Sequence, residues 1–268
     1  SERATNRSAA GELVIVGADT GMGKSAFMTV LADAAADRGA IVAEFALEMP
    51  AENIGQRRLA LRSRVPLPRV RNAAPDGEEL RRLVGAAAEY HPLAVYVDDR
   101  PAVTLAYIAT GLRKLALSVG PVAMVTVDYV QLMSAPDKKG QRRDEQVAAI
   151  TRGLKVLAKE LGCTIIAASQ INRDAMKRDD KRPRKSDLRE SGTIEQDADM
   201  ILLVYREGEY NAECDDPNAA EIIIAKQRNG PTGTVNLRFD GPTARFYDPA
   251  DSAPVVRRGA QGGYGDVH

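Results

Sequence analysis

The chain has 268 residues, of which 44% are hydrophobic and 28% are charged. This composition excludes a fully disordered chain, a collagen-like fibre and a coiled-coil rod, and the length suits one large α/β domain. The 37 basic and 37 acidic residues cancel, which excludes a basic coat over the whole surface but still allows a local basic patch.

The sequence gives little support for a secreted protein, a membrane protein or a protein with a metal cluster. With only two cysteines and two histidines, we expect no disulfide framework, zinc cluster or histidine-centred triad. No apolar run reaches the roughly 18 residues of a membrane span. Residues 1–25 lack the apolar core of a signal peptide. We therefore expect a cytoplasmic protein without a membrane partner, whose catalysis rests on carboxylates, lysine, arginine and backbone amides.

Six short apolar runs, rich in valine and isoleucine, follow one another along the chain. Because they do not alternate with polar residues, they favour parallel strands buried on both faces. The predicted strands are 12–16, 40–46, 93–97, 122–127, 164–169 and 200–205. Two segments between them have helical spacing, with predicted buried stripes of Phe27, Val30, Leu31 and Ala34 in 25–38, and Val147, Ile150, Leu154, Leu157 and Leu161 in 147–161. This alternation predicts a twisted, mostly parallel sheet flanked by helices.

The C-terminal part of the chain has a different pattern. Residues 220–248 are typical of short strands joined by Gly/Pro turns, which predicts an antiparallel hairpin added at one edge of the sheet. Residues 1–248 are therefore predicted to form one domain. The glycine-rich tail, 249–268, is expected to be disordered.

Residues 12–25, ELVIVGADTGMGKS, combine a strand, a glycine-rich loop and a helix start, as a phosphate-binding loop requires. Gly21 and Gly23 allow a tight turn that points backbone N–H groups at phosphate oxygens, and the helix N-terminus attracts the same anion. Lys24 can reach the β- and γ-phosphates, and the Ser25 hydroxyl can bind Mg²⁺. Alanine at position 18 replaces the usual first glycine of the motif, and alanine is tolerated there if its φ is negative. The alternative to a phosphate-binding loop is a chance glycine-rich turn between a strand and a helix. The predicted nucleotide-binding residues are Ala18, Asp19, Thr20, Gly21, Met22, Gly23, Lys24, Ser25 and Ala26.

Polar side chains follow three of the predicted strands. Asp128 and Glu48 come after 122–127 and 40–46. Because ligands of open α/β sheets bind beyond the carboxyl ends of strands, we expect both to meet the phosphate loop in one cleft. Asp128 suits the support of Mg²⁺ and Glu48 suits a general base for water, although each could instead cap a helix or lie on the surface. Gln170 could sense the γ-phosphate or cap a turn.

Two basic segments suggest further contacts. Residues 173–189 hold eight basic and four acidic residues. This excess indicates phosphate contacts on a nucleic acid, with Gly192 and nearby amides adding to the grip; the alternative is a solvated loop. Lys226 and Arg228 precede a Gly-Pro turn at the end of a strand, where they could reach a neighbour's active site or stand exposed on a hairpin.

Together these segments resemble the C-terminal motor domain of DnaB-type replicative helicases, a class of RecA-like P-loop NTPases. The resemblance covers residues 11–248 and is carried, in the family's order, by GADTGMGKSAF, FALEMP, VTVDYVQLM, ASQINR, SDLRESGTIEQDADMILLVYR and IAKQRNGPTG. It implies ATP hydrolysis with Mg²⁺, translocation on single-stranded DNA and duplex unwinding during replication. It also implies a homo-oligomeric ring, hexameric in the family, with ATP at the subunit interfaces.

The resemblance also implies roles for the residues around the nucleotide. Lys24 and Ser25 would bind ATP and Mg²⁺, and Glu48 would be the catalytic base. Asp128 would be the Walker B acid that supports Mg²⁺, and Gln170 would sense the γ-phosphate.

The remaining roles implied by the resemblance lie outside that site. Lys226 and Arg228 would act in trans on ATP held by the adjacent subunit. The loop with Arg189, Glu190 and Gly192 would hold the backbone of single-stranded DNA in a central channel.

Two features depart from the family's pattern. Asp19 and Thr20 replace an Arg-Pro pair, which makes the phosphate loop less rigid and less positive. The chain also starts one strand before this loop, so we expect it to lack the family's helical N-terminal domain and linker helix, which support primase binding and ring assembly. It would then be either a motor fragment or a short relative. Primase and loader contacts are left open.

Two other functions are compatible with part of the sequence. The first is a RecA-like ATPase that acts in recombination or protein remodelling, which would keep the phosphate loop but lack the LRESG loop and stimulation by DNA. The second is a nucleotide-gated scaffold that binds ATP without turnover. Glu48 and Arg228 argue against the scaffold, because both would serve hydrolysis.

Overall fold

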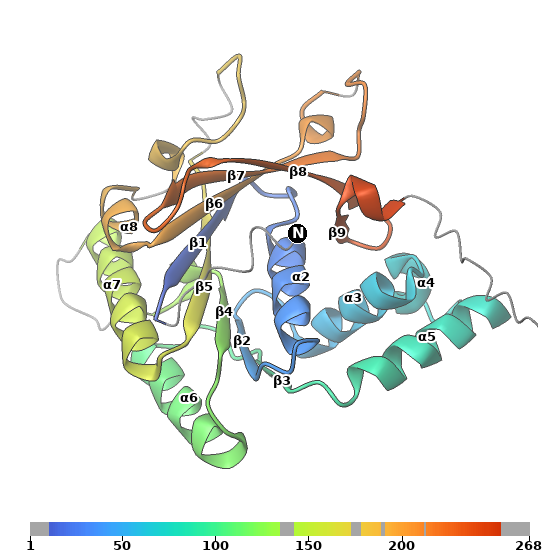
Figure 1. The fold of residues 1–268 in the computed structure, drawn as a ribbon, viewed down its shortest axis with the longest axis horizontal. Coiled ribbons are helices and arrows are strands. Elements are labelled where there is room, and N and C mark those ends of the chain that lie inside the picture. The colour runs from blue at the N-terminus through green and yellow to red at the C-terminus, as the bar shows by residue number, and fades with distance from the viewer. Residues whose placement is uncertain (1–10, 135–141, 173–177, 189–190, 212, 253–268) are drawn as a thin grey trace, which may run out of the picture.

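The computed structural model describes residues 11–134, 142–172, 178–188, 191–211 and 213–252. Within them, one nine-stranded sheet has the order β3-β2-β4-β5-β1-β6-β7-β8-β9 (Figure 1). The strands are β1 (Leu13–Ala18), β2 (Val42–Ala46), β3 (Val95–Asp98), β4 (Met124–Asp128), β5 (Thr164–Gln170), β6 (Met200–Tyr205), β7 (Ala219–Gln227), β8 (Gly233–Asp240) and β9 (Arg245–Tyr247). The helices are α2 (Lys24–Ala36), α3 (Ala51–Ser63), α4 (Leu67–Arg71), α5 (Gly77–Tyr90), α6 (Leu105–Val119), α7 (Arg143–Leu161) and α8 (Ser191–Asp197). Short 3-10 turns are Val130–Leu132, Lys185–Asp187, Glu207–Glu209 and Pro249–Ser252.

The pairing of the strands confirms both parts of the predicted sheet. Strands β1 to β6 pair only in parallel with one another, as the six apolar runs predict. Strands β7, β8 and β9 then add to β6 in antiparallel order, so the predicted hairpin is present with a third strand. The carboxyl ends of the parallel strands therefore lie along one edge, where the candidate site residues follow β1, β2, β4 and β5.

Two apolar clusters hold helices against the two faces of the sheet. One cluster joins the sheet to α6 and α7, and the other joins it to α2 and the C-terminal strands (Figure 1). The predicted stripe of α7 is confirmed, because Val147, Ile150, Leu154 and Leu157 are buried and Leu161 packs against the same cluster. In the described part of the chain, no helix is both long and apolar enough to cross a membrane.

The predicted stripe of α2 packs against the sheet. Phe27 is buried, Val30 and Leu31 pack partly buried against the same cluster, and Ala34 is partly buried. The residues that are fully enclosed also include small alanines, Met28 and the charged Asp33, which lies on the face toward α3. Because α2 lies between the sheet, α3 and β9, more than one of its faces is enclosed, and a single apolar stripe does not describe it.

Strand β3 departs from the prediction of burial on both faces. Its residues are partly buried or exposed, and Tyr96 is 39% exposed. The reason is topological: β3 is the edge of the sheet and pairs only with β2. At the other terminus, the predicted tail begins with the turn Pro249–Ser252, and its remainder, 253–268, lies outside the described residues.

Candidate active site

The loop between β1 and α2 has the geometry of a phosphate-binding loop. Gly21 and Gly23 have φ of +86° and +88°, a conformation that L side chains rarely adopt. A Cβ on Gly23 would also lie 3.0 Å from the ring of Phe246. Ala18, the last residue of β1, has no positive φ, so its side chain is compatible with the backbone there. Gly23 caps α2 without a side chain, which leaves the first N–H groups of the helix open to an anion.

Lys24 begins α2 and is buried beside three carboxylates. Burial lowers the pKa of Lys24, and the negative charges of Asp128, Glu48 and Asp19 oppose that effect. Its ammonium group lies 5.9 Å from the centroid of the Tyr129 ring. A poorly solvated cation of this kind binds an anionic ligand strongly, because little water has to be displaced from it.

Asp128 and Ser25 together form a pair that fits a divalent cation. Asp128 ends β4, and its carboxylate lines the same small cavity as the Ser25 hydroxyl. Burial raises the pKa of Asp128, while the nearby Ser25 hydroxyl, Lys24 and Arg57 lower it. The Oδ1 atom of Asp128 is buried and has no hydrogen-bond partner. A buried, unpartnered carboxylate oxygen beside a hydroxyl is the donor set that Mg²⁺ takes together with nucleotide phosphates.

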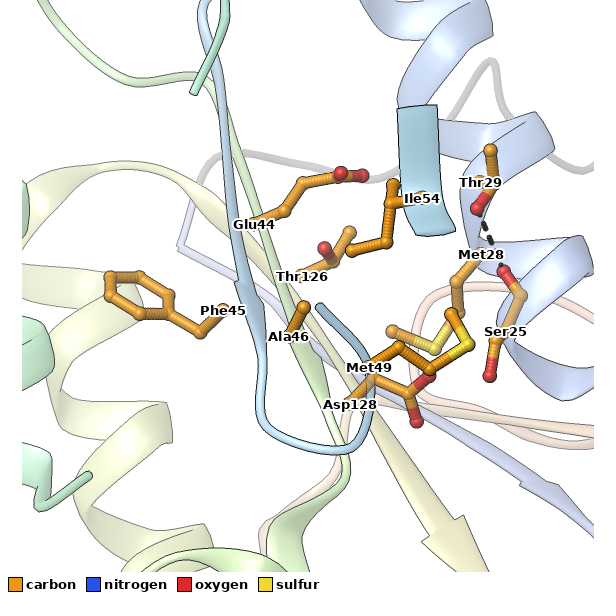
Figure 2. A pocket seen from close by; sticks show the side chains of 10 residues that line it. All are labelled: Ser25, Met28, Thr29, Glu44, Phe45, Ala46, Met49, Ile54, Thr126 and Asp128. Atoms are coloured by element: carbon orange, nitrogen blue, oxygen red, sulfur yellow. Dashed lines mark hydrogen bonds between the residues drawn. The ribbon is translucent and has the colours of Figure 1, made fainter. Parts of the chain in front are cut away.

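A small cavity adjoins this pair. Its volume is about 30 Å³, and Ser25 and Asp128 face it beside Met28 and Met49 (Figure 2). A volume of this size holds about one or two water molecules, and the hydroxyl and carboxylate provide polar partners for them. Glu44 of β2 reaches the same cavity from the opposite side.

A larger cavity of about 360 Å³ adjoins the phosphate loop. It brings together the residues that we predicted to act on ATP bound to their own chain. Glu48 and Gln170 line it with Lys24 and Ser25, and Asp128 adjoins it through the small cavity. The register explains this meeting, because Ala46 pairs with Asp128 and Ala18 pairs with Gln170 at one edge of the sheet. Of the predicted loop residues, Ala18 and Met22 are buried in the core and do not line the cavity.

Arg57 lines the same cavity and was not predicted from the sequence. It lies on α3, nine residues after Glu48, and its Nε atom is buried without a hydrogen-bond partner. Burial and the nearby charge of Arg71 lower the pKa of Arg57, while Asp128 and Glu48 raise it. No motif marks this arginine, because α3 carries two others, at 58 and 62, and a further one follows at its C-terminal boundary.

The far wall of the cavity is also missing from the sequence-based prediction. It consists of Leu67 and of Phe239, Gly241 and Ala244 from the β8–β9 hairpin. The guanidinium of Arg206 lies 4.0 Å from the centroid of that ring and donates to the Gly21 carbonyl at 3.3 Å. The antiparallel strands thus form part of the wall around the phosphate loop.

Lys226 and Arg228 lie far from this cavity in their own chain. Met200, the first residue of β6, pairs with both Val14 and Gln227, so the end of β7 lies beside the start of the parallel strands. The phosphate loop lies beyond the other end of β1, and a six-residue strand spans roughly 17 Å. Lys226 donates to the carbonyl of Ala198 at 2.6 Å, and Arg228 pairs with the carboxylate of Asp199 at 3.1 Å.

The predicted DNA-binding residues are only partly within the described chain. Arg189 and Glu190 lie outside the described residues, and Gly192 lies in the first turn of α8. Much of the positive charge of the preceding basic segment is paired. The pairs are Arg178 with Asp187 at 2.6 Å, Arg182 with Glu221 at 2.7 Å and Lys185 with Glu195 at 2.5 Å.

Comparison with known proteins identifies the family. A family model described as the DnaB-like helicase C terminal domain matches residues 2–248. The chain belongs to this family. Replicative DNA helicase DnaB of Buchnera aphidicola subsp. Acyrthosiphon pisum (strain APS) is 43% identical over 239 residues, which are 88% of this chain and 51% of that protein. The protein of the same name from Geobacillus stearothermophilus is 38% identical, over 89% of this chain and 52% of its own length.

Solved structures agree with the fold. One, described as "The Structure Of A DnaB-Like Replicative Helicase And Its Interactions With Primase", has a TM-score of 0.86 at 34% identity and covers 90% of this chain and 58% of that chain. Another, described as an ATPase domain, has a TM-score of 0.85 at 34% identity and covers 90% of this chain and 85% of that chain. The predicted RecA-like α/β fold is therefore confirmed. The chain spans about half the length of the curated DnaB helicases it matches.

Proposed function

We propose that this chain is the ATP-hydrolysing motor domain of a replicative DNA helicase. The proposal rests mainly on one observation: the candidate nucleotide-binding groups lie at one end of the sheet, and a pair of basic side chains lies at the other. The phosphate loop, Glu48, Asp128 and Gln170 share one cavity system, while Lys226 and Arg228 lie at the other end of the strands. Membership of the DnaB-like helicase family supports the same function.

The residues of the cavity account for hydrolysis of a nucleoside triphosphate. Lys24 and the loop amides bind the β- and γ-phosphates, while Ser25 and Asp128 hold Mg²⁺. When bound, Mg²⁺ neutralises charge on the phosphates. Glu48 orients a water molecule and accepts its proton as the water oxygen attacks the γ-phosphorus and the bond to the β–γ bridging oxygen breaks. Gln170 contacts the γ-phosphate from the neighbouring strand.

Two features missed by sequence reasoning complete the binding of ATP. The unpartnered Nε of Arg57 adds a donor for the phosphates from α3. The apolar wall at Leu67 and Phe239 offers a surface for the purine base, while Arg206 covers the other part of the Phe239 ring. A cavity of about 360 Å³ suits a ligand of nucleotide size.

Lys226 and Arg228 act on ATP that is bound to a second copy of the chain. A head-to-tail arrangement places the end of β7 of one copy against the phosphate loop of the next, and repetition closes a ring. The positive charges then stabilise the transition state in trans. The family resemblance supports a hexamer, and the loop 189–192 would contact the backbone of single-stranded DNA inside that ring.

The proposal is tested by ATP turnover of the Glu48→Gln variant with and without single-stranded DNA. Loss of the base lowers kcat by roughly 10²–10⁴-fold, while ATP binding persists because the phosphate loop is intact. The matched control is Glu52→Gln, which changes an exposed glutamate in the first turn of α3, whose carboxylate accepts from Gln56 at 3.2 Å. We expect the control to keep the turnover of the unchanged chain and its stimulation by DNA.

Three results would contradict the proposal in different ways. Equal turnover in Glu48→Gln and Glu52→Gln would remove Glu48 from the chemistry. Turnover that single-stranded DNA leaves unchanged would favour a RecA-like ATPase with another task. Absence of turnover in an assembled chain with Mg²⁺ and DNA would favour the nucleotide-gated scaffold.

A further inference from the structure

A buried carboxylate, Asp199, lies at the start of β6 and makes three contacts. It is 5% exposed, accepts from the backbone N–H of Leu13 at 2.8 Å and pairs with the ammonium of Lys155. Its third partner is Arg228, whose guanidinium lies 3.1 Å from Oδ1 while half of the arginine side chain remains exposed. The carboxylate is therefore fixed by the core on one side and presents a charged anchor to the surface on the other.

The turn that carries Arg228 is held by further contacts around this anchor. The backbone N–H of Arg228 donates to the carbonyl of Asp199 at 2.8 Å. Asn229 donates to the buried carboxylate of Glu12 at 3.2 Å, and Lys226 donates to two carbonyls at the C-terminal end of α8. The turn after β7 is thus bonded to the start of β1, the end of α8 and the start of β6.

We propose that Asp199 is the positioning residue of Arg228, which it holds in the orientation needed to reach ATP on the adjacent copy. This inference rests on the proposed function, because it requires Arg228 to act in trans. An exposed arginine samples many rotamers, and an ion pair to a rigid buried carboxylate selects a few of them before the two copies meet. Correct placement matters because transition-state stabilisation falls steeply when a charged group is displaced by about 1 Å.

The same contacts link Arg228 to the proposed DNA-binding segment. Lys226 and Arg228 both donate to carbonyls near the end of α8, and Gly192 lies in the first turn of that helix. The cationic pair and α8 therefore form one bonded unit. A displacement of α8 would change the place of the positive charges that face the neighbouring copy.

Asp199 could instead serve the stability of its own chain alone, and subunit mixing separates the two roles. A chain with Asp199→Asn keeps its own phosphate loop but would present a misplaced Arg228 to its neighbour. A chain with Lys24→Ala has a defective phosphate loop but a correctly held Arg228. In a mixed ring, roughly a quarter of the interfaces combine the intact phosphate loop of an Asp199→Asn chain with the correctly held Arg228 of a Lys24→Ala chain.

The experiment measures ATP turnover of Asp199→Asn alone, and of its mixture with Lys24→Ala chains. Alone, we expect kcat to fall by roughly a hundredfold with KM for ATP changed less than about twofold, because the contacts that bind ATP belong to the other copy. In the mixture, turnover should exceed that of either variant alone. The control is Asp216→Asn, which breaks a more exposed Asp–Arg ion pair, with Arg238 (2.6 Å) at β8, and should leave turnover unchanged.

A parallel mixture of Arg228→Ala with Lys24→Ala separates the failure of this inference from the failure of the proposed function. Recovery with Arg228→Ala but not with Asp199→Asn would overturn the positioning role alone. No recovery in either mixture would overturn action in trans, and the inference with it. If Asp199→Asn does not fold, the double variant with Lys155→Met, which removes the charge left without its partner, is used instead. Failure of both to fold would show that Asp199 serves the fold and would overturn the inference.

Discussion

Gly23, the last glycine of the phosphate loop, meets two separate restrictions. Its φ of +88° disfavours any L side chain, and an added Cβ would lie 3.0 Å and 3.1 Å from two ring atoms of Phe246. Gly39, which follows α2, has a similar φ of +84° but no atom within 4 Å of an added Cβ. The two glycines therefore allow the cost of backbone conformation to be separated from the cost of crowding.

We predict that Gly39→Ala lowers the free energy of unfolding by about 1–2 kcal/mol, the cost of a left-handed alanine. Gly23→Ala should lower it by about 1–3 kcal/mol more, because the phenylalanine ring must also move. Urea denaturation of both variants without nucleotide measures the difference. Equal losses of stability would show that the ring accommodates the methyl group without cost.

At this scale the sequence predicts the site residues that belong to a motif. Lys24, Ser25, Glu48, Asp128 and Gln170 each follow a recognisable strand, and parallel strands bring their carboxyl ends to one edge. Their convergence therefore follows from sequence order alone.

Arg57 and Phe239 could not be found in that way. Arg57 lies on a helix with several arginines, and only packing decides which of them reaches the cavity. Phe239 belongs to an added antiparallel strand that is distant in sequence from the phosphate loop. No local sequence pattern predicts that this strand lines the cavity.

Among the secondary-structure elements, α2, α3 and β2 are joined by a buried ionic cluster. Arg58 of α3 is 2% exposed and bonds the Glu44 carboxylate through two nitrogens, at 2.7 Å and 2.8 Å. Its Nε bonds Asp33 of α2 at 2.6 Å, and its guanidinium also lies 5.5 Å from the centroid of the Tyr90 ring. This cluster fixes the helix that carries Arg57 against the helix that follows the phosphate loop.

We predict that Arg58→Met lowers the free energy of unfolding by roughly 3–5 kcal/mol, because it leaves the buried Glu44 carboxylate without its partner and leaves Asp33 with Arg62 alone. The control is Arg113→Met, which removes an exposed pair with Glu160 at 2.6 Å and should cost less than about 1 kcal/mol. Chemical denaturation at neutral pH compares the two variants. A loss in Arg58→Met as small as that of Arg113→Met would show that water or rearrangement compensates the carboxylates.

The same cluster explains which elements the sequence predicts well. Apolar runs reveal the central strands and the stripe of α7, because these elements are buried by hydrophobic contact. Helix α3 buries Arg58 and Ser63 beside only a few apolar side chains, so its inward face resembles a solvated one in the sequence. In α2, hydrophobic periodicity finds the side that carries Phe27, Val30 and Leu31 but does not reveal the enclosed face with Asp33.

In the whole molecule, the candidate catalytic groups lie at two ends of one sheet. The cavity system holds the phosphate loop and its carboxylates, and the turn after β7 holds Lys226 and Arg228 near the opposite ends of the strands. A single copy cannot bring these groups together without breaking the sheet. We therefore infer that hydrolysis depends on contact between copies.

The most direct test is ATP turnover per chain over a wide range of chain concentration, with the mass of the protein in solution determined at each point. We predict that turnover per chain rises in step with the assembled fraction and is close to zero where the chain is a monomer. Constant turnover per chain down to concentrations at which only monomer is present would contradict the claim that two copies form each active site.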